Sequence, residues 1–149
     1  MRVIFLTGGP NVGKTTTTLE LVRRKVCDYV ITPGVWLRGI VAQRNLERPT
    51  PETDLANYVG TNRSNDVLLA EARGAQCVIV EGYPRTAGES VFAATYAAEL
   101  TSAASGVAVV VLDLSDEDTV VRGTQRARAG DDTATSLVHG LNYWRKNAE

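Results

Sequence analysis

The sequence predicts an α/β fold in which helices cover a parallel β-sheet. Short apolar runs rich in β-branched residues alternate with helical segments, and each run is apolar on both faces, as buried parallel strands are. A glycine-rich turn joins the first run directly to a helix. The chain has 149 residues, the size of one ordinary domain, so we expect a single domain over residues 1–149.

The first strand and the first helix enclose the glycine-rich loop. Val3–Leu6 is an apolar run of strand formers, and a helix follows the loop from about Gly13. The apolar residues of this helix fall on a single stripe: Leu19, Val22 and Val26.

A second strand and an irregular excursion come next. Tyr29–Ile31 is a brief apolar run, and the excursion at about residues 33–65 holds prolines and polar residues. Ser64 is suited to cap a helix over residues 65–73, and Gly74 is suited to end that helix.

The C-terminal half predicts two further strands and three helices. The strands are Cys77–Val80 and Val107–Leu112, and the helices cover about residues 89–104, 116–129 and 132–147. The last helix has three apolar residues on one face: Leu137, Leu141 and Trp144.

Composition and charge exclude several classes of protein. The chain has 16 Lys and Arg against 17 Asp and Glu, so it has no global basic field to hold a long nucleic acid. Its two cysteines lack CxxC spacing and it has one histidine, which excludes a zinc cluster and a triad built on several histidines. The apolar run near the N-terminus is too short for a signal peptide or a membrane span, so we expect a cytoplasmic protein.

The strongest motif is the loop Gly8–Thr15, GGPNVGKT, which matches G-x-x-x-x-G-K-[ST] between a predicted strand and a predicted helix. Gly8 and Gly13 allow backbone N–H groups to point at phosphate oxygens, and the helix N-terminus adds a positive field. Lys14 can reach the β- and γ-phosphates, and the Thr15 hydroxyl can ligate Mg²⁺. The motif predicts a site for ATP or another NTP with Mg²⁺. The predicted nucleotide-binding residues are Gly8, Gly9, Pro10, Asn11, Val12, Gly13, Lys14, Thr15 and Thr16.

Other motifs narrow the class of P-loop protein. A GTPase needs an N-K-x-D string that reads the base and a D-x-x-G switch, and the sequence contains neither. A kinase needs several arginines around the transferring phosphoryl group, and arginine makes up most of the 16 Lys and Arg residues. These two observations favour a kinase.

A string at the end of the third predicted strand carries a resemblance to a known family. Glu81–Arg85 reads EGYPR, and the adenylate-kinase-like nucleoside monophosphate kinases have D-G-F/Y-P-R at this point. Their acceptor-side T-G-D-L-L-R is similar to Thr32–Arg38, in which the glycine and the arginine keep their spacing. Their arginine-bearing lid and R-x-D-D string are similar to residues 122–132, with one extra residue before the aspartates. The resemblance covers most of the chain.

This resemblance implies a P-loop NTPase-type sheet of about four strands in the order 2-3-1-4 between helices. It also implies a short arginine-bearing lid at about residues 122–131, ATP or another NTP with Mg²⁺, and a nucleotide substrate. The implied catalytic residues are Lys14, Glu81, Arg85, Arg122, Arg126 and Arg128, of which Arg122 also binds the donor. The implied acceptor-binding residues are Gly34, Arg38, Gly82, Arg85 and Glu89. Thr15 and Glu81 would act on the metal ion, and Asp131 and Asp132 would anchor the lid.

The chain departs from the family pattern in four places. Glu89 stands where the family has a glutamine that reads the adenine of AMP, and a carboxylate cannot donate that hydrogen bond. The acceptor excursion is shorter, and Gly140, beside His139, stands near the family's last catalytic arginine. The chain also stops before the family's fifth strand, so we expect loose selectivity for the donor base.

Three functions remain open on the sequence. The leading hypothesis is transfer of the γ-phosphoryl group of Mg-ATP to a nucleoside monophosphate or a nucleotide-like acceptor. The first alternative is a kinase of a hydroxyl group on a small metabolite, nucleoside, modified DNA base or polynucleotide, with Glu81 or Asp54 as the base. The second alternative is a module that binds nucleotide without transferring phosphate. We expect small nucleotides as partners, and a monomer or a homodimer because one sheet edge has no cover.

Overall fold

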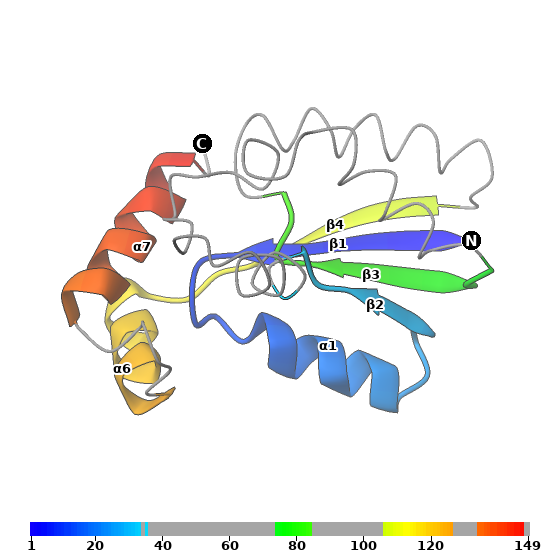
Figure 1. Cartoon of the computed structure of the whole chain (residues 1–149), viewed down its shortest axis with the longest axis horizontal. Coiled ribbons are helices and arrows are strands. Elements are labelled where there is room, and N and C mark those ends of the chain that lie inside the picture. The colour runs from blue at the N-terminus through cyan, green and yellow to red at the C-terminus, as the bar shows by residue number, and fades with distance from the viewer. Residues whose placement is uncertain (34, 36–73, 85–105, 127–133, 148–149) are drawn as a thin grey trace, which may run out of the picture.

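A parallel β-sheet forms the centre of the protein (Figure 1). The computed structural model describes residues 1–33, 35, 74–84, 106–126 and 134–147. Within these residues the sheet has the strand order β2-β3-β1-β4 and every pairing is parallel. The strands are β1 (Arg2–Gly8), β2 (Tyr29–Ile31), β3 (Cys77–Glu81) and β4 (Gly106–Leu112). The predicted parallel sheet and its strand order are confirmed.

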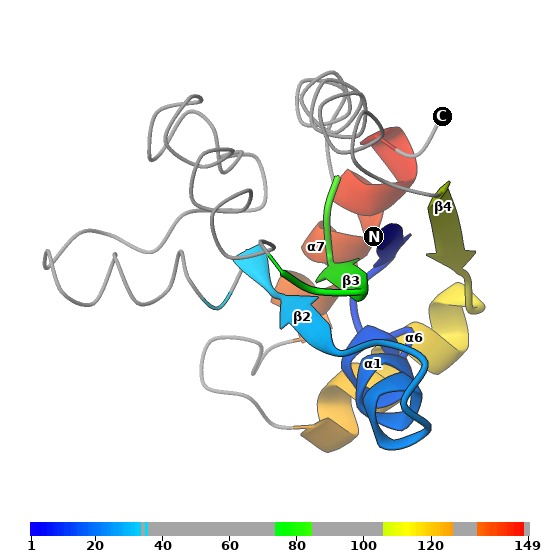
Figure 2. The ribbon, with the colours of Figure 1, turned by 90° about the vertical axis from the view of Figure 1, so that its right-hand side faces the viewer.

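The described helices lie on one face of the sheet and beyond one of its ends. They are α1 (Lys14–Arg23), α6 (Asp116–Arg126) and α7 (Ala134–Asn147). α1 runs along the sheet against β3 and β1, whereas α6 and α7 pack on each other past the carboxyl ends of the strands (Figure 1, Figure 2). The predicted helices over residues 65–73 and 89–104, and nearly all of the excursion, fall outside the described residues.

The strand register brings the carboxyl ends of β1, β3 and β4 together at one end of the sheet. β1 pairs with β3 up to Leu6 opposite Glu81, and with β4 up to Gly8 opposite Leu112. Open α/β sheets bind their ligands at this end, because the loops that leave the strands converge there. The loop after β1 therefore lies beside the residues that end β3.

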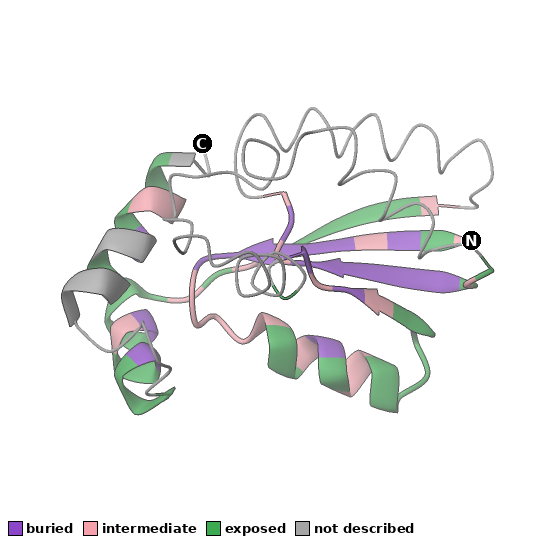
Figure 3. Cartoon of the chain, in the orientation of Figure 1, coloured by how far each residue is buried: buried purple, intermediate pink, exposed green. Residues whose placement is uncertain are grey.

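Two buried clusters of apolar side chains pack along the sheet. Alternation along β1 places Val3 and Phe5 in one cluster and Leu6 in the other. β3 is buried along its whole length, as a central parallel strand should be (Figure 3). The first cluster contains Val3, Phe5, Ile31, Val78, Val80 and Tyr83, and the second contains Leu6, Cys27, Cys77 and Ile79.

The face that α1 turns to the sheet differs from the predicted apolar stripe. Thr18 is buried and Leu21 packs on the second cluster. These residues lie four and seven positions after Lys14, on the same side of the helix, and Lys14 is turned toward the loop before it. Thr18 and Leu21, and not the apolar stripe, therefore form the face that α1 turns to the sheet. The stripe is exposed, at Leu19 64%, Val22 42% and Val26 38%.

The expectation that every strand is buried on both faces is wrong for β4. Val109 and Val111 are 62% and 60% exposed, although the same strand is the longest β-branched run of the chain. In the described part of the chain β4 pairs only with β1, so it is an edge strand (Figure 3). β-Branched composition alone does not separate an edge strand from a central one.

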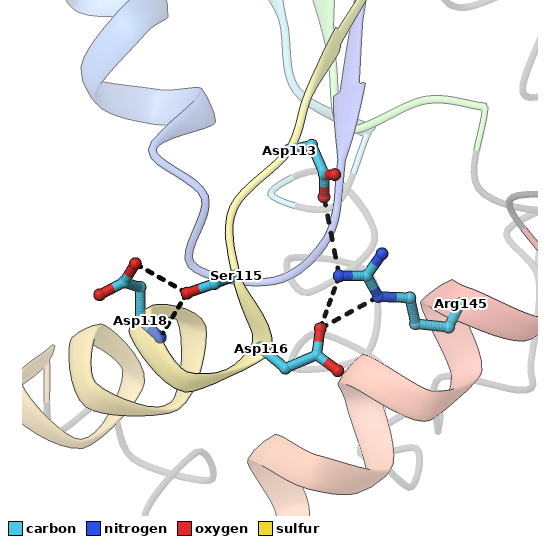
Figure 4. Close-up of polar contacts among 5 residues, drawn as sticks. All are labelled: Asp113, Ser115, Asp116, Asp118 and Arg145. Atoms are coloured by element: carbon cyan, nitrogen blue, oxygen red, sulfur yellow. Dashed lines mark hydrogen bonds and ion pairs between the residues drawn. The ribbon is translucent and has the colours of Figure 1, made fainter.

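A side-chain cap defines the start of α6. The Ser115 hydroxyl accepts a hydrogen bond from the backbone N–H of Asp118 at 3.1 Å and donates to its carboxylate at 2.7 Å (Figure 4). Acidic side chains fill the first turn, where the helix dipole favours negative charge. The predicted start at residue 116 is confirmed.

The Asp28 carboxylate ties the segment before β2 to the start of β3. It accepts hydrogen bonds from the backbone N–H groups of Gln76 at 2.8 Å and Cys77 at 2.6 Å. These two bonds lower the pKa of Asp28 because they stabilise its ionised form. The native state therefore binds this proton less tightly than the unfolded chain does.

We predict that Asp28→Ala lowers the free energy of unfolding at pH 7 and that its effect fades in acid. The pKa is lowered in the folded chain, so the stabilisation is present above the unfolded-state pKa of about 3.9 and is lost as pH falls through the folded value. Urea unfolding of both proteins from pH 7 to pH 3 measures the gap. Asp28→Asn is the control, since it keeps one acceptor oxygen without a charge. A gap of constant size across this range would contradict the assignment.

Candidate functional site

The candidate site is the loop between β1 and α1 together with the groups that surround it. Three residues with positive φ shape this loop: Gly8 at 145°, Asn11 at 57° and Gly13 at 99°. Gly13 is the N-cap of α1, and no side chain hydrogen-bonds to that cap in the described residues. The first N–H groups of the helix are therefore available to an anion.

Gly8 is required by close packing as well as by its backbone angle. A Cβ atom at this position would lie 2.3 Å from the carbonyl oxygen of Leu112 on β4. Backbone atoms of two paired strands cannot give way to such a contact without breaking the sheet. Gly8 thus lets the loop leave β1 directly against β4.

Lys14 lies over the inner side of the loop. Its Nζ donates to the carbonyl oxygens of Gly8 at 2.8 Å and Gly9 at 2.6 Å. Its Cε lies 3.9 Å from the position that a Cβ of Gly82 would take, which places the side chain next to the end of β3. The ammonium group is thus held at the mouth of the loop, where it can meet a phosphate oxygen.

Thr15 and Glu81 form a pair between the helix and the sheet. The Thr15 hydroxyl donates to Glu81 Oε1 at 2.6 Å, and Glu81 is only 7% exposed. Gly82 N–H donates to the Leu6 carbonyl at 2.8 Å, which holds the end of β3 against β1. A hydroxyl and a carboxylate are hard oxygen ligands, so this pair fits Mg²⁺, with phosphate and water oxygens as the remaining ligands.

α6 brings two of the predicted arginines to the same loop. Arg122 Nη1 lies 3.8 Å from the position of a Cβ on Gly13, and Arg126 Nη1 lies 3.5 Å from Asn11 Oδ1. They lie four residues apart, on one side of the helix. The loop is therefore flanked by positive charge from a separate element, although the whole chain has a formal charge of −1.

The structure also places α7 at the loop, which the sequence did not predict. The Trp144 ring lies against Gly9, with Cδ1 3.0 Å from the position of a Cβ on that glycine. Next to it, Arg145 Nη2 contacts Asp116 Oδ1 at 2.6 Å (Figure 4). The sequence signal was an aromatic residue on an apolar helix face, which is also the pattern of an ordinary core residue.

The described residues bring together the predicted phosphate-binding loop, the hydrogen-bonded Thr15 and Glu81, and two of the predicted arginines. Thr16, in the first turn of α1, is exposed. α7 contains His139, whose side chain is outside the described residues. The other predicted site residues outside the described part are Gly34, Arg38, Arg85, Glu89, Arg128, Asp131 and Asp132.

Comparison with known proteins agrees with this architecture. Residues 7–138 match the model of a protein family described as an AAA domain. The chain belongs to this AAA-domain family. The match includes the loop, Glu81 and both α6 arginines, whereas Trp144 and Arg145 lie beyond it.

Two named relatives align with the whole chain at low identity. An adenylate kinase of Nocardia farcinica is 26% identical over 153 residues, which cover 100% of this chain and 82% of the relative. An adenylate kinase of Micrococcus luteus is 26% identical over 156 residues, which cover 100% of this chain and 75% of the relative. The chain is thus shorter than both, and the predicted similarity to adenylate-kinase-like proteins is confirmed.

Two further findings concern the described residues only. None of their helices is long and apolar enough to cross a membrane. No group of three or more His, Cys, Asp and Glu side chains among them is arranged to hold a metal ion.

We predict that Gly8→Ala destabilises the protein by roughly 2–4 kcal/mol and removes nucleotide binding, because its Cβ collides with the β4 backbone. Urea unfolding and ATP titration measure the two effects. Gly74→Ala is the matched control, because Gly74 has φ +89° but no heavy atom within 4 Å of a Cβ there. We expect this control to cost about 1 kcal/mol from backbone strain alone. Equal costs for the two variants would show that the contact with Leu112 is not limiting.

Proposed function

We propose that the chain is a P-loop kinase that transfers the γ-phosphoryl group of Mg-ATP to a nucleotide, with a nucleoside monophosphate as the acceptor. One observation carries the proposal: Lys14 and the α6 arginines, Arg122 and Arg126, converge on a loop built to bind phosphate. Phosphoryl transfer depends on positioning and on neutralising negative charge, and this arrangement supplies both.

The residues of the loop act on the donor. Backbone N–H groups at the start of α1 bind the phosphate chain, and Lys14 exchanges its contacts with Gly8 and Gly9 for phosphate oxygens. Arg122 and Arg126 approach from α6 and offset the charge on the transferring group. Arg128, which follows them in the chain, completes this set in the proposal.

Thr15 and Glu81 would hold Mg²⁺ beside the phosphates. The metal ion supplies charge neutralisation and fixes the geometry of the phosphate chain. Glu81 is buried and hydrogen-bonded to Thr15, so its carboxylate is oriented toward the first turn of α1. That orientation supports a role on the metal side and not as a base for a hydroxyl acceptor.

The acceptor side of the proposal rests on motifs and on the relatives. The EGYPR string begins at the buried Glu81, which ends β3 beside the loop, and Arg85 is the last residue of that string. We propose that Arg38 and Arg85 bind the acceptor phosphate, with Gly34, Gly82 and Glu89 around the acceptor. Asp131 and Asp132 would anchor the lid. The relatives are named adenylate kinases, but Glu89 does not suit adenine, so we infer a different base or a modified acceptor.

Phosphoryl transfer from γ-labelled ATP tests the function directly. The acceptors are a panel of ribo- and deoxyribonucleoside monophosphates, nucleosides and short oligonucleotides, each with Mg²⁺. We expect the label on a nucleoside monophosphate. Label on a hydroxyl acceptor alone would establish the other kind of kinase, and tight ATP binding with no transfer would indicate a binding module.

We predict that Lys14→Ala lowers kcat by about 100-fold or more, because it removes a positive charge from the transferring phosphoryl group. Lys25→Ala is the matched control, since it removes an exposed lysine outside the loop, beyond the end of α1. Steady-state kinetics of both variants make the comparison. Activity of Lys14→Ala within a few-fold of the control would overturn the placement of the phosphates.

We predict that Arg85→Ala raises the KM of the acceptor by about tenfold or more and leaves the KM of ATP within about twofold. The reason is that a guanidinium binds a phosphate through paired hydrogen bonds, which alanine cannot replace. Arg24→Ala, at an exposed residue just after α1, is the control for loss of one arginine. A larger effect on ATP than on the acceptor would place Arg85 in the donor site.

A further inference from the structure

We propose that Trp144 is a positioning residue of the phosphate-binding loop, held against Gly9 by an ion-pair clamp at Arg145. The proposal rests on the proposed function for its consequence in turnover, but its direct consequence is for ATP binding. Neither Trp144 nor Arg145 lies within the part of the chain that matches the AAA-domain family, residues 7–138. The contact is therefore a property of this chain that its family membership does not assign.

The contact between the indole and the loop depends on glycine. A Cβ at Gly9 would lie 3.0 Å from Trp144 Cδ1, 3.3 Å from Nε1 and 3.5 Å from Cγ. The edge of the five-membered ring thus occupies the space that a larger residue would need. Gly9 is buried and Trp144 is partly buried, so the indole covers this side of the loop.

The same glycine is held from the inner side of the loop by Lys14. The Lys14 ammonium donates to the Gly9 carbonyl at 2.6 Å, so the residue is fixed between an aromatic ring and a cation. Binding of a phosphate draws Lys14 away from this carbonyl, whereas the ring can stay. Trp144 thus keeps the start of the loop in place when Lys14 leaves, which lowers the cost of reorganisation on binding.

Arg145 connects this ring to the end of the sheet. Its guanidinium contacts Asp116 Oδ1 through Nη2 at 2.6 Å and Nε at 3.1 Å, and Nη2 lies 3.9 Å from Asp113 Oδ1 (Figure 4). Asp113 follows β4 and Asp116 opens α6, so the clamp joins α7 to both elements. All three side chains are exposed, and salt screens such a clamp. It orients α7 more than it stabilises the fold.

α6 and α7 consequently contact opposite ends of the loop. Arg122 and Arg126 reach it at Gly13 and Asn11, while Trp144 reaches it at Gly9. The clamp at Asp116 lies where these two helices meet. A displacement of α6 and α7 changes the surroundings of the loop at both ends. We expect the fluorescence emission of Trp144 to change with it.

A double-mutant cycle tests the contact. We expect Trp144→Ala to raise the dissociation constant of Mg-ATP by about tenfold, with Trp144→Phe closer to the unmodified protein because it keeps a ring. Gly9→Ala should weaken binding in the unmodified chain, since its methyl group displaces the ring, and should have a much smaller effect beside Trp144→Ala. Isothermal titration with Mg-ATP measures the four proteins of the cycle and Trp144→Phe. Additive effects, or binding by Trp144→Ala within twofold of the unmodified protein, would overturn the proposal.

A second pair of variants, Arg145→Ala and Arg23→Ala, tests the ion-pair clamp. We expect Arg145→Ala to weaken Mg-ATP binding at low salt by several-fold and to have less effect at high salt, where the pair is already screened. Arg23→Ala is the control, because Arg23 forms an exposed pair with Glu20 on α1, away from the loop. The same loss of affinity in both variants, or a loss for Arg145→Ala that does not depend on salt, would remove the clamp from the proposal.

Fluorescence separates this inference from the proposed function. The chain has two tryptophans, Trp36 and Trp144, so a Trp36→Phe protein carries Trp144 alone. We expect its emission to change on addition of Mg-ATP, with or without an acceptor. A protein that shows this change and the binding cycle, but transfers no phosphate, retains the inference and loses the proposed function. A protein that transfers phosphate normally with no response at Trp144 does the opposite.

Discussion

The phosphate-binding loop between β1 and α1 is the place where the neighbouring elements meet, and Lys14 contacts its backbone. Lys14 is the first residue of α1, and its ammonium bonds to two carbonyl oxygens of the loop that precedes it. Thr18 and Leu21 follow on the same side and face the sheet, and Thr15, one step round the helix, meets Glu81 at the end of β3. α1 thus packs on the sheet through a face that hydrophobic patterning does not predict.

Most of the described fold and the position of the phosphate-binding loop were predictable from the sequence, because their signals are local. Short β-branched runs and a glycine-rich loop between strand and helix are local signals, and they located β1 to β4, the loop and the start of α6. The face of α1 that meets the sheet was not predicted, because its buried residue is a threonine, Thr18, and not a residue of the apolar stripe. The exposure of β4 was not local either, since it depends on which elements cover the faces of the strand and not on its own composition. The contact of Trp144 with Gly9 joins residues 135 positions apart, and no spacing rule connects them.

Charge in this protein is organised locally and not by its overall balance. The formal net charge is −1, yet Lys14 and two α6 arginines surround the loop, while acidic residues gather in the first turn of the same helix. The two signs occupy opposite ends of α6, which also suits the helix dipole, with Arg126 in the last turn. Asp116 at the start of α6 contacts Arg145 of α7, while Arg122 and Arg126 lie near the loop. Acidic and basic side chains of one helix thus have separate neighbours.

Four other elements of the fold contact this loop. β4 meets it through the Leu112 carbonyl at Gly8, β3 through Glu81 at Thr15, α6 through its arginines, and α7 through Trp144. Glycine is required at Gly8 and Gly9 for different reasons, since a side chain would strike backbone at the first and an indole at the second. A backbone obstacle is fixed, whereas an indole can shift. The loop therefore meets backbone where it leaves the sheet and a side chain where it meets α7, and only the second neighbour can change its position without breaking the sheet.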